Sequence, residues 1–266
     1  MAFRFFDLYT TFMKATLLIS AGIALFASVA LYMSNTSTGE GSATSLVPVA
    51  FSQIVGDHEK FPTEVVELFT SQGCSSCPPA DRFIASLADS PSVLPLTFNV
   101  TYWDYLGWKD RFGQREFTSR QKSYAKVFGA GNVYTPQIIL NGAQHSNKFT
   151  REQIKSKRLT DSRPLIDLKF EGQSLRAQSL SGADISAYDL TVVSFSPGLQ
   201  ATPVKRGENR NRTLENYNVV TGVYNLTQDE GFSLNMPGHK AGMAYALLAS
   251  SPDTAEILSV TRILPK

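Results

Sequence analysis

The chain contains two cysteines, Cys74 and Cys77, which are separated by two serines and followed by a pair of prolines. Two thiols at this spacing can form a disulfide with each other, exchange it with another disulfide, or bind a soft metal ion. As a structural cross-link the pair would add little, since closing so short a loop stabilises a protein by roughly 2 kcal/mol, against about 3 kcal/mol for a 15-residue loop. We therefore interpret the pair first as a redox-active dithiol, with a metal site and a structural bridge as alternatives.

The residues on either side of the cysteines predict a strand, a loop and a helix. Residues 65–69 are an apolar run typical of a buried β-strand. After the cysteines, apolar residues recur at the i, i+3, i+4 and i+7 spacing of an amphipathic helix: Ala80, Phe83, Ile84 and Leu87. Because proline is tolerated in the first turn, the helix should begin at or just before Cys77. Free N–H groups there favour a thiolate, so we expect Cys74 to be the nucleophile and the more buried Cys77 to resolve the mixed disulfide.

Further elements follow in the order of an α/β domain. The pattern predicts a strand over 94–101, a helix over 116–128, a strand over 137–140, a tight turn at Asn141-Gly142, a returning strand over 143–145, and a capped helix from Thr150 to about residue 158. The first domain is thus a mixed sheet flanked by helices.

From about residue 163 the helical periodicity nearly disappears and short alternating runs replace it. The best candidate strands are 165–170, 190–195, 218–223, 243–250 and 257–264. We expect a smaller, mostly antiparallel β domain here, a sandwich or partial barrel packed on the first domain. The predicted domains are therefore 1–50, 51–160 and 161–266.

The N-terminal segment differs from the rest because residues 15–33 carry no charge and follow Lys14 and Arg4. Such a run can just cross a membrane, yet Ser28-Val29-Ala30 also has the form of a signal-peptidase site. We interpret the segment as an export signal or a membrane anchor. The body of the protein is then exported, periplasmic or extracytoplasmic, and attached to the inner membrane if residues 15–33 are retained.

Several runs in the chain carry a resemblance to a known superfamily. They are Glu67 to Asp81 around the cysteines, Tyr102 to Trp108, Tyr134-Thr135-Pro136-Gln137 and Gly207-Glu208-Asn209. Residues 61–157 resemble a thioredoxin-like domain, and more narrowly an exported bacterial family catalogued as a domain of unknown function. The chain departs from ordinary thioredoxins because Ser-Ser replaces Gly-Pro between the cysteines and no tryptophan precedes Cys74.

The resemblance implies roles for further residues. Pro136 would be the cis-proline that lies opposite the dithiol and, with Thr135, shapes the groove for substrate backbone. Thioredoxins also use a buried carboxylate in the strand before the dithiol to move the proton of the resolving cysteine. Glu67 could act in this way if it lies within hydrogen-bond reach, and an exposed glutamate at a strand end is the alternative.

Two other segments invite a functional interpretation. Residues 102–108 hold four aromatic side chains, and Trp103 among them either walls the substrate groove or belongs to the core. The polar run 207–212 either reaches the dithiol, binds an anionic group, or forms a solvated loop.

The sequence favours a thiol-disulfide oxidoreductase that needs no dissociable cofactor. Its partners would be a protein or small-thiol disulfide substrate and an unidentified redox partner. Nucleic acid is excluded as a partner because the 25 basic and 23 acidic residues are interspersed along the chain. We predict no zinc site, since a second close Cys/His pair is absent. The alternative function is a copper or thiol-ligand carrier in which the cysteines and a distant histidine, His145, hold the ligand.

Overall fold

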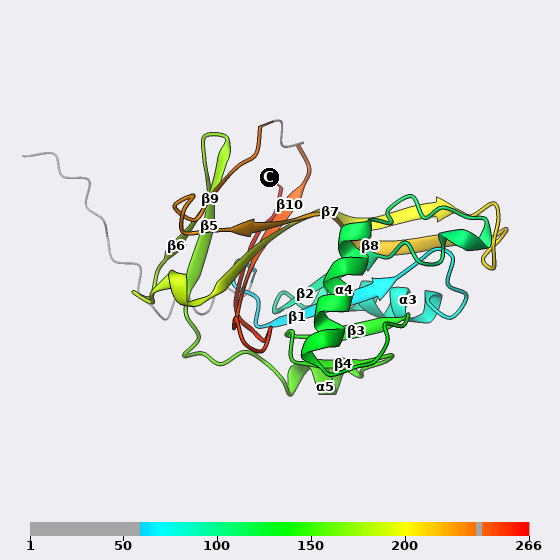
Figure 1. The fold of residues 1–266 in the computed structure, drawn as a ribbon, viewed down its shortest axis with the longest axis horizontal. Helices are drawn as coiled ribbons and strands as arrows, with labels where there is room; N and C mark the ends of the chain where they lie inside the picture. The colour runs from blue at the N-terminus through cyan, green and yellow to red at the C-terminus, as the bar shows by residue number, and fades with distance from the viewer. Residues whose placement is uncertain (1–58, 238–240, 266) are drawn as a thin grey trace, which may run out of the picture. The chain divides into compact units, whose positions relative to one another are not determined.

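We describe a computed structural model of the chain, which defines residues 59–237 and 241–265 (Figure 1). These residues all belong to one compact unit. The expected export segment at 15–33 lies outside the described residues. Within the described ranges, no helix is both long enough and apolar enough to span a bilayer.

The first part of the chain alternates strands with helices, as the sequence predicts. Its elements are β1 (Glu64–Thr70), α3 (Pro78–Ser86), the short 3₁₀ helix η1 (Leu87–Asp89), β2 (Val93–Asn99), η2 (Asp104–Leu106), α4 (Arg115–Val127), β3 (Gln137–Leu140), β4 (Gln144–Ser146) and α5 (Arg151–Lys155). The capping box at the start of α5 is confirmed, since Thr150 and Gln153 bond reciprocally. The helix ends earlier than expected, at Lys155.

The second part of the chain is built almost entirely of strands. They are β5 (Ile166–Glu171), β6 (Ser174–Ser179), β7 (Asp189–Pro203), β8 (Thr213–Leu226), β9 (Ser233–Asn235), β10 (Ala244–Ser250) and β11 (Ile257–Ile263), with η3 (Ile185–Ala187) before β7. All five predicted strands are present. β7 and β8 are much longer than expected and form one antiparallel hairpin.

The strands form a mixed eight-stranded sheet in the order β11-β10-β7-β8-β2-β1-β3-β4, and a separate three-stranded sheet in the order β5-β6-β9. β1 is parallel to β2 and antiparallel to β3. The two parts of the large sheet meet where β2 runs parallel to β8, at Thr97 and Val219. The Thr97 hydroxyl also donates to the carbonyl of Tyr217 at 2.6 Å, and the Asn218 side chain donates to the carbonyl of Pro95 at 2.9 Å.

This continuity differs from the expected arrangement of a second domain packed on the first. Four of the later strands, β7, β8, β10 and β11, extend the same sheet instead, because the β7–β8 hairpin aligns with β2. The expected sandwich is present in a smaller form, since the β5-β6-β9 sheet packs on β7 and β10 through a shared apolar cluster that includes Leu168, Leu175, Val192 and Leu247. The domain boundaries themselves stay a prediction.

Side-chain alternation along β1 determines which helix each residue faces. Successive residues of a strand point to opposite faces of the sheet. Val66 and Leu68 pack in one cluster with Ala80 and Ile84 of α3, whereas Val65 and Phe69 pack in another with Phe117 and Tyr124 of α4. The two helices therefore cover opposite faces of β1.

Candidate functional site

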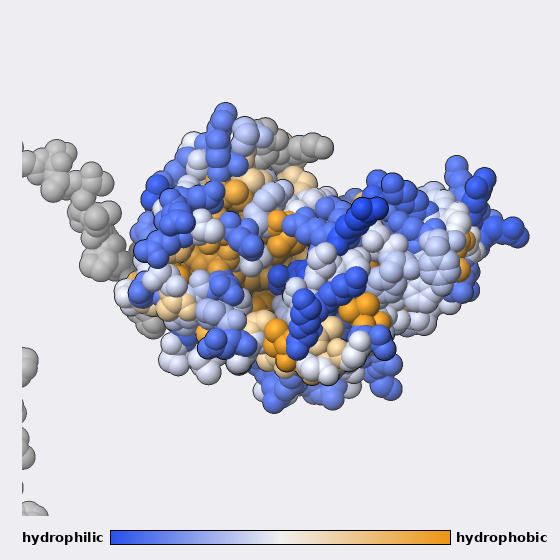
Figure 2. Space-filling view, viewed as in Figure 1, coloured by the Kyte–Doolittle hydropathy of each residue, from blue (hydrophilic) through white to orange (hydrophobic). Residues whose placement is uncertain are grey.

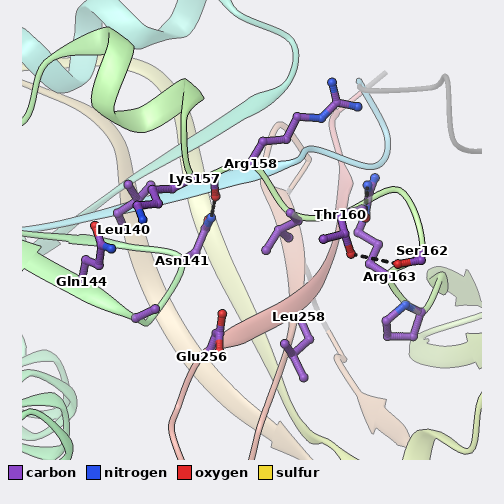
Figure 3. Close-up of a pocket in the computed structure, with 13 residues that line it drawn as sticks. Leu140, Asn141, Gln144, Lys157, Arg158, Thr160, Ser162, Arg163, Glu256 and Leu258 are labelled. Carbon is purple, nitrogen blue, oxygen red and sulfur yellow. Dashed lines mark hydrogen bonds between the residues drawn. The ribbon is translucent and has the colours of Figure 1, made fainter.

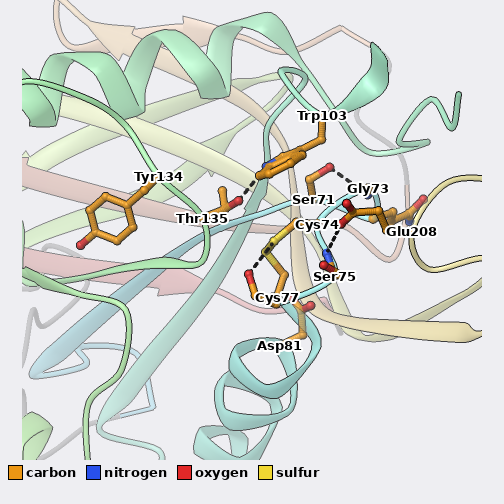
Figure 4. The surroundings of a disulfide bond; sticks show 12 residues. Ser71, Gly73, Cys74, Ser75, Cys77, Asp81, Trp103, Tyr134, Thr135 and Glu208 are labelled. Carbon is orange, nitrogen blue, oxygen red and sulfur yellow. Dashed lines mark hydrogen bonds between the residues drawn. A yellow bond between two sulfur atoms is a disulfide. The ribbon is translucent and has the colours of Figure 1, made fainter. Parts of the chain in front are cut away.

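Cys74 and Cys77 form a disulfide in the loop between β1 and α3, with their Cα atoms 5.5 Å apart (Figure 4). Cys77 is the N-cap residue of α3, and two prolines occupy the first turn, as expected. Both cysteines are covered, with 1% and 0% of their surfaces exposed, while the two serines between them are exposed. The expected difference in burial between the two cysteines is therefore absent in the disulfide form.

Two distant segments hold the backbone of the dithiol loop. The buried carboxylate of Asp110 accepts a hydrogen bond from the N–H of Gln72 at 2.7 Å. From the connection between β7 and β8, the side chain of Asn209 donates to the carbonyl oxygens of Gln72 and Cys74, at 3.0 and 2.9 Å. Asn209 is fully buried. The run 207–212 thus reaches the dithiol loop and is not simply a solvated loop.

Trp103 links the dithiol loop to the segment that contains Pro136. Its indole N–H donates to the hydroxyl of Thr135 at 2.7 Å, and the side chain is half-buried. A Cβ atom added at Gly73 would come within 2.9 Å of the Cβ of Trp103, which explains why the loop has a glycine there. Trp103 therefore packs against the core and also borders the dithiol, as Figure 4 shows.

A groove of about 490 Å³ begins beside the dithiol loop. The Thr135-Pro136 peptide bond is cis, as the resemblance implies. The groove has a mainly apolar wall and a polar rim; its lining includes Ser76, Pro79, Phe83, Thr135, Pro136, Lys148 and Phe149. Ser76 lies between the two cysteines, so the groove offers an apolar surface next to the disulfide.

Asp81 is a buried carboxylate one helical turn after Cys77. Burial raises the pKa of Asp81 from 3.8 to about 7, an effect that the neighbouring Thr70 hydroxyl and Asn216 amide partly offset. The Asn216 amide donates to the carboxylate at 3.1 Å. Residues four apart on a helix are neighbours on its surface, and Figure 4 shows Asp81 on the side of α3 that carries Cys77. The sequence analysis missed this residue, although its spacing from Cys77 was a usable signal.

The part of the chain that carries these residues matches a known family. Residues 65–249 match the family described as "Protein of unknown function (DUF1223)". The chain belongs to this family. The matched range runs from β1 into β10, so the DUF1223 unit includes both the dithiol loop and the β7–β8 connection that holds it.

Solved structures and curated proteins offer further likenesses. The DUF1223 chain is similar to a crystal structure of a protein from Agrobacterium tumefaciens, with a TM-score of 0.59 and 27% identity over 77% of this chain and 95% of that one. HBP35 of Porphyromonas gingivalis gives a TM-score of 0.48 at 11% identity, covering 77% and 76% of the two chains, which is too weak to carry an argument. Shikimate dehydrogenase (NADP(+)) of Actinobacillus succinogenes is 25% identical over 206 residues, 68% of this chain and 69% of that enzyme.

The turn between β1 and α3 does not have the form of a dinucleotide-binding turn. A dinucleotide site of that kind needs a glycine-rich G-x-G-x-x-G turn between a strand and a helix. In this DUF1223 chain the turn between β1 and α3 contains one glycine, Gly73, together with the two cysteines and two prolines. This turn carries two cysteines in place of the glycine series of a nucleotide-binding turn.

Glu67 lies on the other face of the sheet. It is fully buried, and its carboxylate accepts hydrogen bonds from Arg120 at 2.8 Å and from the hydroxyl of Tyr124. Burial raises the pKa of Tyr124, so the phenol keeps the proton that it donates. α4 covers the face of β1 that carries Glu67, whereas α3, which carries Asp81, covers the opposite face.

His145 is engaged away from the dithiol loop. Its ring stacks on Phe128, with centroids 4.6 Å apart, and its Nδ1 lies 2.9 Å from the hydroxyl of Tyr134. Within the described ranges of the chain, no group of three or more His, Cys, Asp or Glu residues is arranged to hold a metal ion. The ligand set that a copper carrier would need is therefore not assembled around His145 here.

A second pocket, of about 380 Å³, lies between the β3–β4 turn and β11 (Figure 3). Two of its cationic residues have partners: Arg158 pairs with Asp161 at 2.9 Å, and Arg163 donates to the carbonyl oxygens of Phe61 and Thr160. The pocket contains neither cysteine nor any residue of the dithiol loop. The candidate site of this DUF1223 protein is therefore the dithiol and the groove beside it.

Proposed function

We propose that this protein is an exported thiol-disulfide oxidoreductase whose reactive groups are Cys74 and Cys77. The observation that carries the proposal is a disulfide between these cysteines at the first turn of α3, next to an apolar groove bordered by Thr135 and Pro136. A disulfide that closes so short a loop contributes little as a cross-link. Its position at a helix N-terminus instead suits a reactive thiolate.

The same proposal assigns the first part of the chain to the thioredoxin-like superfamily. The element order from β1 to α5, the parallel β1–β2 pair and the antiparallel β3–β4 pair support this assignment. So does the cis peptide bond before Pro136. The large sheet then continues into strands β7, β8, β10 and β11, which extend it beyond that domain.

The reaction transfers two electrons between the dithiol and a substrate disulfide. The Cys74 thiolate attacks one sulfur of the substrate disulfide, a mixed disulfide forms, and the first substrate thiolate leaves. Cys77 then loses its proton and attacks the sulfur of Cys74, which releases the second substrate thiolate and leaves Cys74 and Cys77 joined. The substrate is reduced and the protein is oxidised; the reverse sequence oxidises a substrate dithiol.

Asp81 would take the proton that Cys77 loses in the second step. A general base works best when its pKa lies near the working pH, and burial raises the pKa of Asp81 to about 7. The Asn216 amide holds the carboxylate in place while the rest of its surroundings exclude water. Asp81 therefore replaces Glu67 in the role that the resemblance suggested.

Trapping the mixed disulfide tests the proposal. A Cys77→Ser variant that is reduced and then mixed with a disulfide-containing peptide should accumulate a covalent adduct at Cys74, visible by mass and released by dithiothreitol. A Cys74→Ser variant serves as the matched control and should form far less adduct, because the proposal assigns the attack on the substrate disulfide to the Cys74 thiolate. If neither variant forms an adduct, and the native protein exchanges with no disulfide, the oxidoreductase function is wrong.

A further inference from the structure

Two loops that meet beside the dithiol carry an unusual number of cations. The first is residues 102–113, which contains Lys109 and Arg111; the second is the connection 204–212 between β7 and β8, which contains Lys205, Arg206, Arg210 and Arg212. The loops touch at Gly207, where a Cβ atom would lie 3.3 Å from the Cβ of Trp108. We call these six basic residues the cationic rim.

The cationic rim is exposed and has little to neutralise it. All six residues are exposed, and among the described residues none of them forms an ion pair. The second loop has a single carboxylate, Glu208, which accepts a hydrogen bond from the N–H of Ser75 at 3.3 Å. The first loop has two carboxylates: Asp104, which is partly buried and accepts a hydrogen bond from the N–H of Asp110 at 3.1 Å, and Asp110, which is buried and whose pKa is raised by burial. The six basic residues thus outnumber the three acidic residues of the two loops. At the end of the molecule where the β7–β8 connection lies, hydrophilic side chains project from a paler surface (Figure 2).

Hydrogen bonds fix the cationic rim in place relative to the disulfide. Asn209 lies in the middle of the second loop and binds the carbonyl oxygens of Gln72 and Cys74. Arg212 donates to the side-chain oxygen of Asn209 at 3.1 Å. On the first loop, the indole N–H of Trp108 donates to the side chain of Gln72 at 3.0 Å. Both loops are thus anchored to the same residues that carry the dithiol.

We infer that the cationic rim docks an acidic segment of a partner protein and brings the disulfide of that partner to Cys74 and Cys77. This inference rests on the proposed function. A partner must approach closely, because both cysteines are almost fully covered. The excess of positive charge on the two loops beside the disulfide raises the rate at which acidic partners arrive and lowers it for basic ones.

A protein partner fits the surface better than an anionic membrane does. Membrane-binding surfaces combine basic residues with several apolar side chains that insert into the bilayer. Tyr105 is the one large apolar side chain on the two loops that is strongly exposed, at 76%. The groove on the other side of the dithiol, lined by Phe83 and Phe149, offers a place for an apolar side chain of the same partner.

The test compares two disulfide peptides that differ only in having Glu or Lys next to their cysteines. At low salt, about 20 mM, we expect the reduced protein to react at least about tenfold faster with the acidic peptide, and the ratio to fall towards one at about 0.5 M salt. A double variant that combines Lys205→Gln and Arg206→Gln should lower the ratio of the two rates severalfold. The matched control, Lys169→Gln with Arg176→Gln on the β5–β6 sheet, should leave it unchanged.

Two further measurements separate this inference from the proposed function. The rate of exchange with an uncharged small disulfide, hydroxyethyl disulfide, should be the same in the native protein and in the two double variants. If the native protein does not exchange with this disulfide, the oxidoreductase function is wrong. Binding of the acidic peptide to a Cys74→Ser, Cys77→Ser protein, measured by fluorescence anisotropy, tests docking without chemistry. Equal binding of acidic and basic peptides, or tighter binding to anionic phosphatidylglycerol vesicles than to the peptide, would overturn the inference.

Discussion

The backbone N–H of Asp81 donates to the carbonyl oxygen of Cys77 at 3.1 Å, which places the two side chains one turn apart on the same side of α3. Asp81 is buried and carries a carboxylate whose pKa is raised to about 7. In the proposed reaction, this relationship would bring the resolving cysteine and its proton acceptor together within one helix. It is the basis of the first two predictions.

Asp81→Asn should slow the step in which Cys77 resolves the mixed disulfide. The amide cannot accept the thiol proton, and loss of a general base costs about a hundredfold or more in rate. Single-turnover release of product from a preformed mixed disulfide measures this step. Glu67→Gln is the informative comparison, because it removes a buried carboxylate on the opposite face of β1; an equal loss of rate in that variant would contradict the assignment to Asp81.

Asp81 should also make the stability of the protein depend on pH. Its pKa in the folded protein lies above its ordinary value of 3.8, so the folded state binds more protons between about pH 4 and pH 7. The free energy of unfolding should therefore fall as the pH rises through this range, by up to about 4 kcal/mol, and change little above it. Urea unfolding of the native protein, of Asp81→Asn and of a control at the exposed Asp229 measures the effect. If the free energy of unfolding of Asp81→Asn falls with pH as steeply as that of the native protein, the pH dependence comes from groups other than Asp81.

Asn209→Ala should destabilise the protein by about 2 kcal/mol or more, because two buried carbonyl oxygens of the dithiol loop lose their donor. Asn225→Ala removes an exposed amide from β8 and should change the free energy of unfolding by less than about 0.5 kcal/mol. Both values come from urea unfolding of the oxidised protein. Equal, small effects of the two substitutions would mean that the β7–β8 connection does not support the dithiol loop.

Trp103→Ala should lower the rate of exchange with a peptide disulfide by about tenfold, since the hydrogen bond to Thr135 and the packing against the dithiol loop are both lost. Tyr105→Ala removes an exposed aromatic side chain from the same segment and is the matched control. If the exchange rate and the stability of Trp103→Ala are both unchanged, Trp103 does not contribute to the substrate groove.

Local patterns in the sequence predicted the elements around the dithiol well. The apolar run of β1, the prolines of α3 and the capping residue Thr150 each act within a few positions of the element that they define. β6 and β9 were missed because their sequences, Ser174–Ser179 and Ser233–Asn235, are short and largely polar. The lengths of β7 and β8 were underestimated because polar residues continue the hairpin beyond its apolar part.

Long-range contacts could not be predicted in the same way. Asn209 and Gln72 are 137 positions apart, and their hydrogen bond depends on how the β7–β8 hairpin aligns with β2. Asp81 was overlooked for a different reason: a charged residue in the first turn of an amphipathic helix is usually exposed. The Thr70 hydroxyl and the Asn216 side chain of β8, which partly offset the effect of its burial, come from other elements of the fold. Glu67, by contrast, is buried by Arg120 and Tyr124 of α4.

The redox equilibrium of Cys74 and Cys77 tests the central claim most directly. The part of the chain from about Phe51 onward would be equilibrated with glutathione or dithiothreitol buffers, and its free thiols would be counted by alkylation and mass. A working oxidoreductase should show a reversible two-electron transition at a potential between about −120 and −270 mV. A disulfide that resists reduction throughout this range, or one that never forms, would contradict the proposed function.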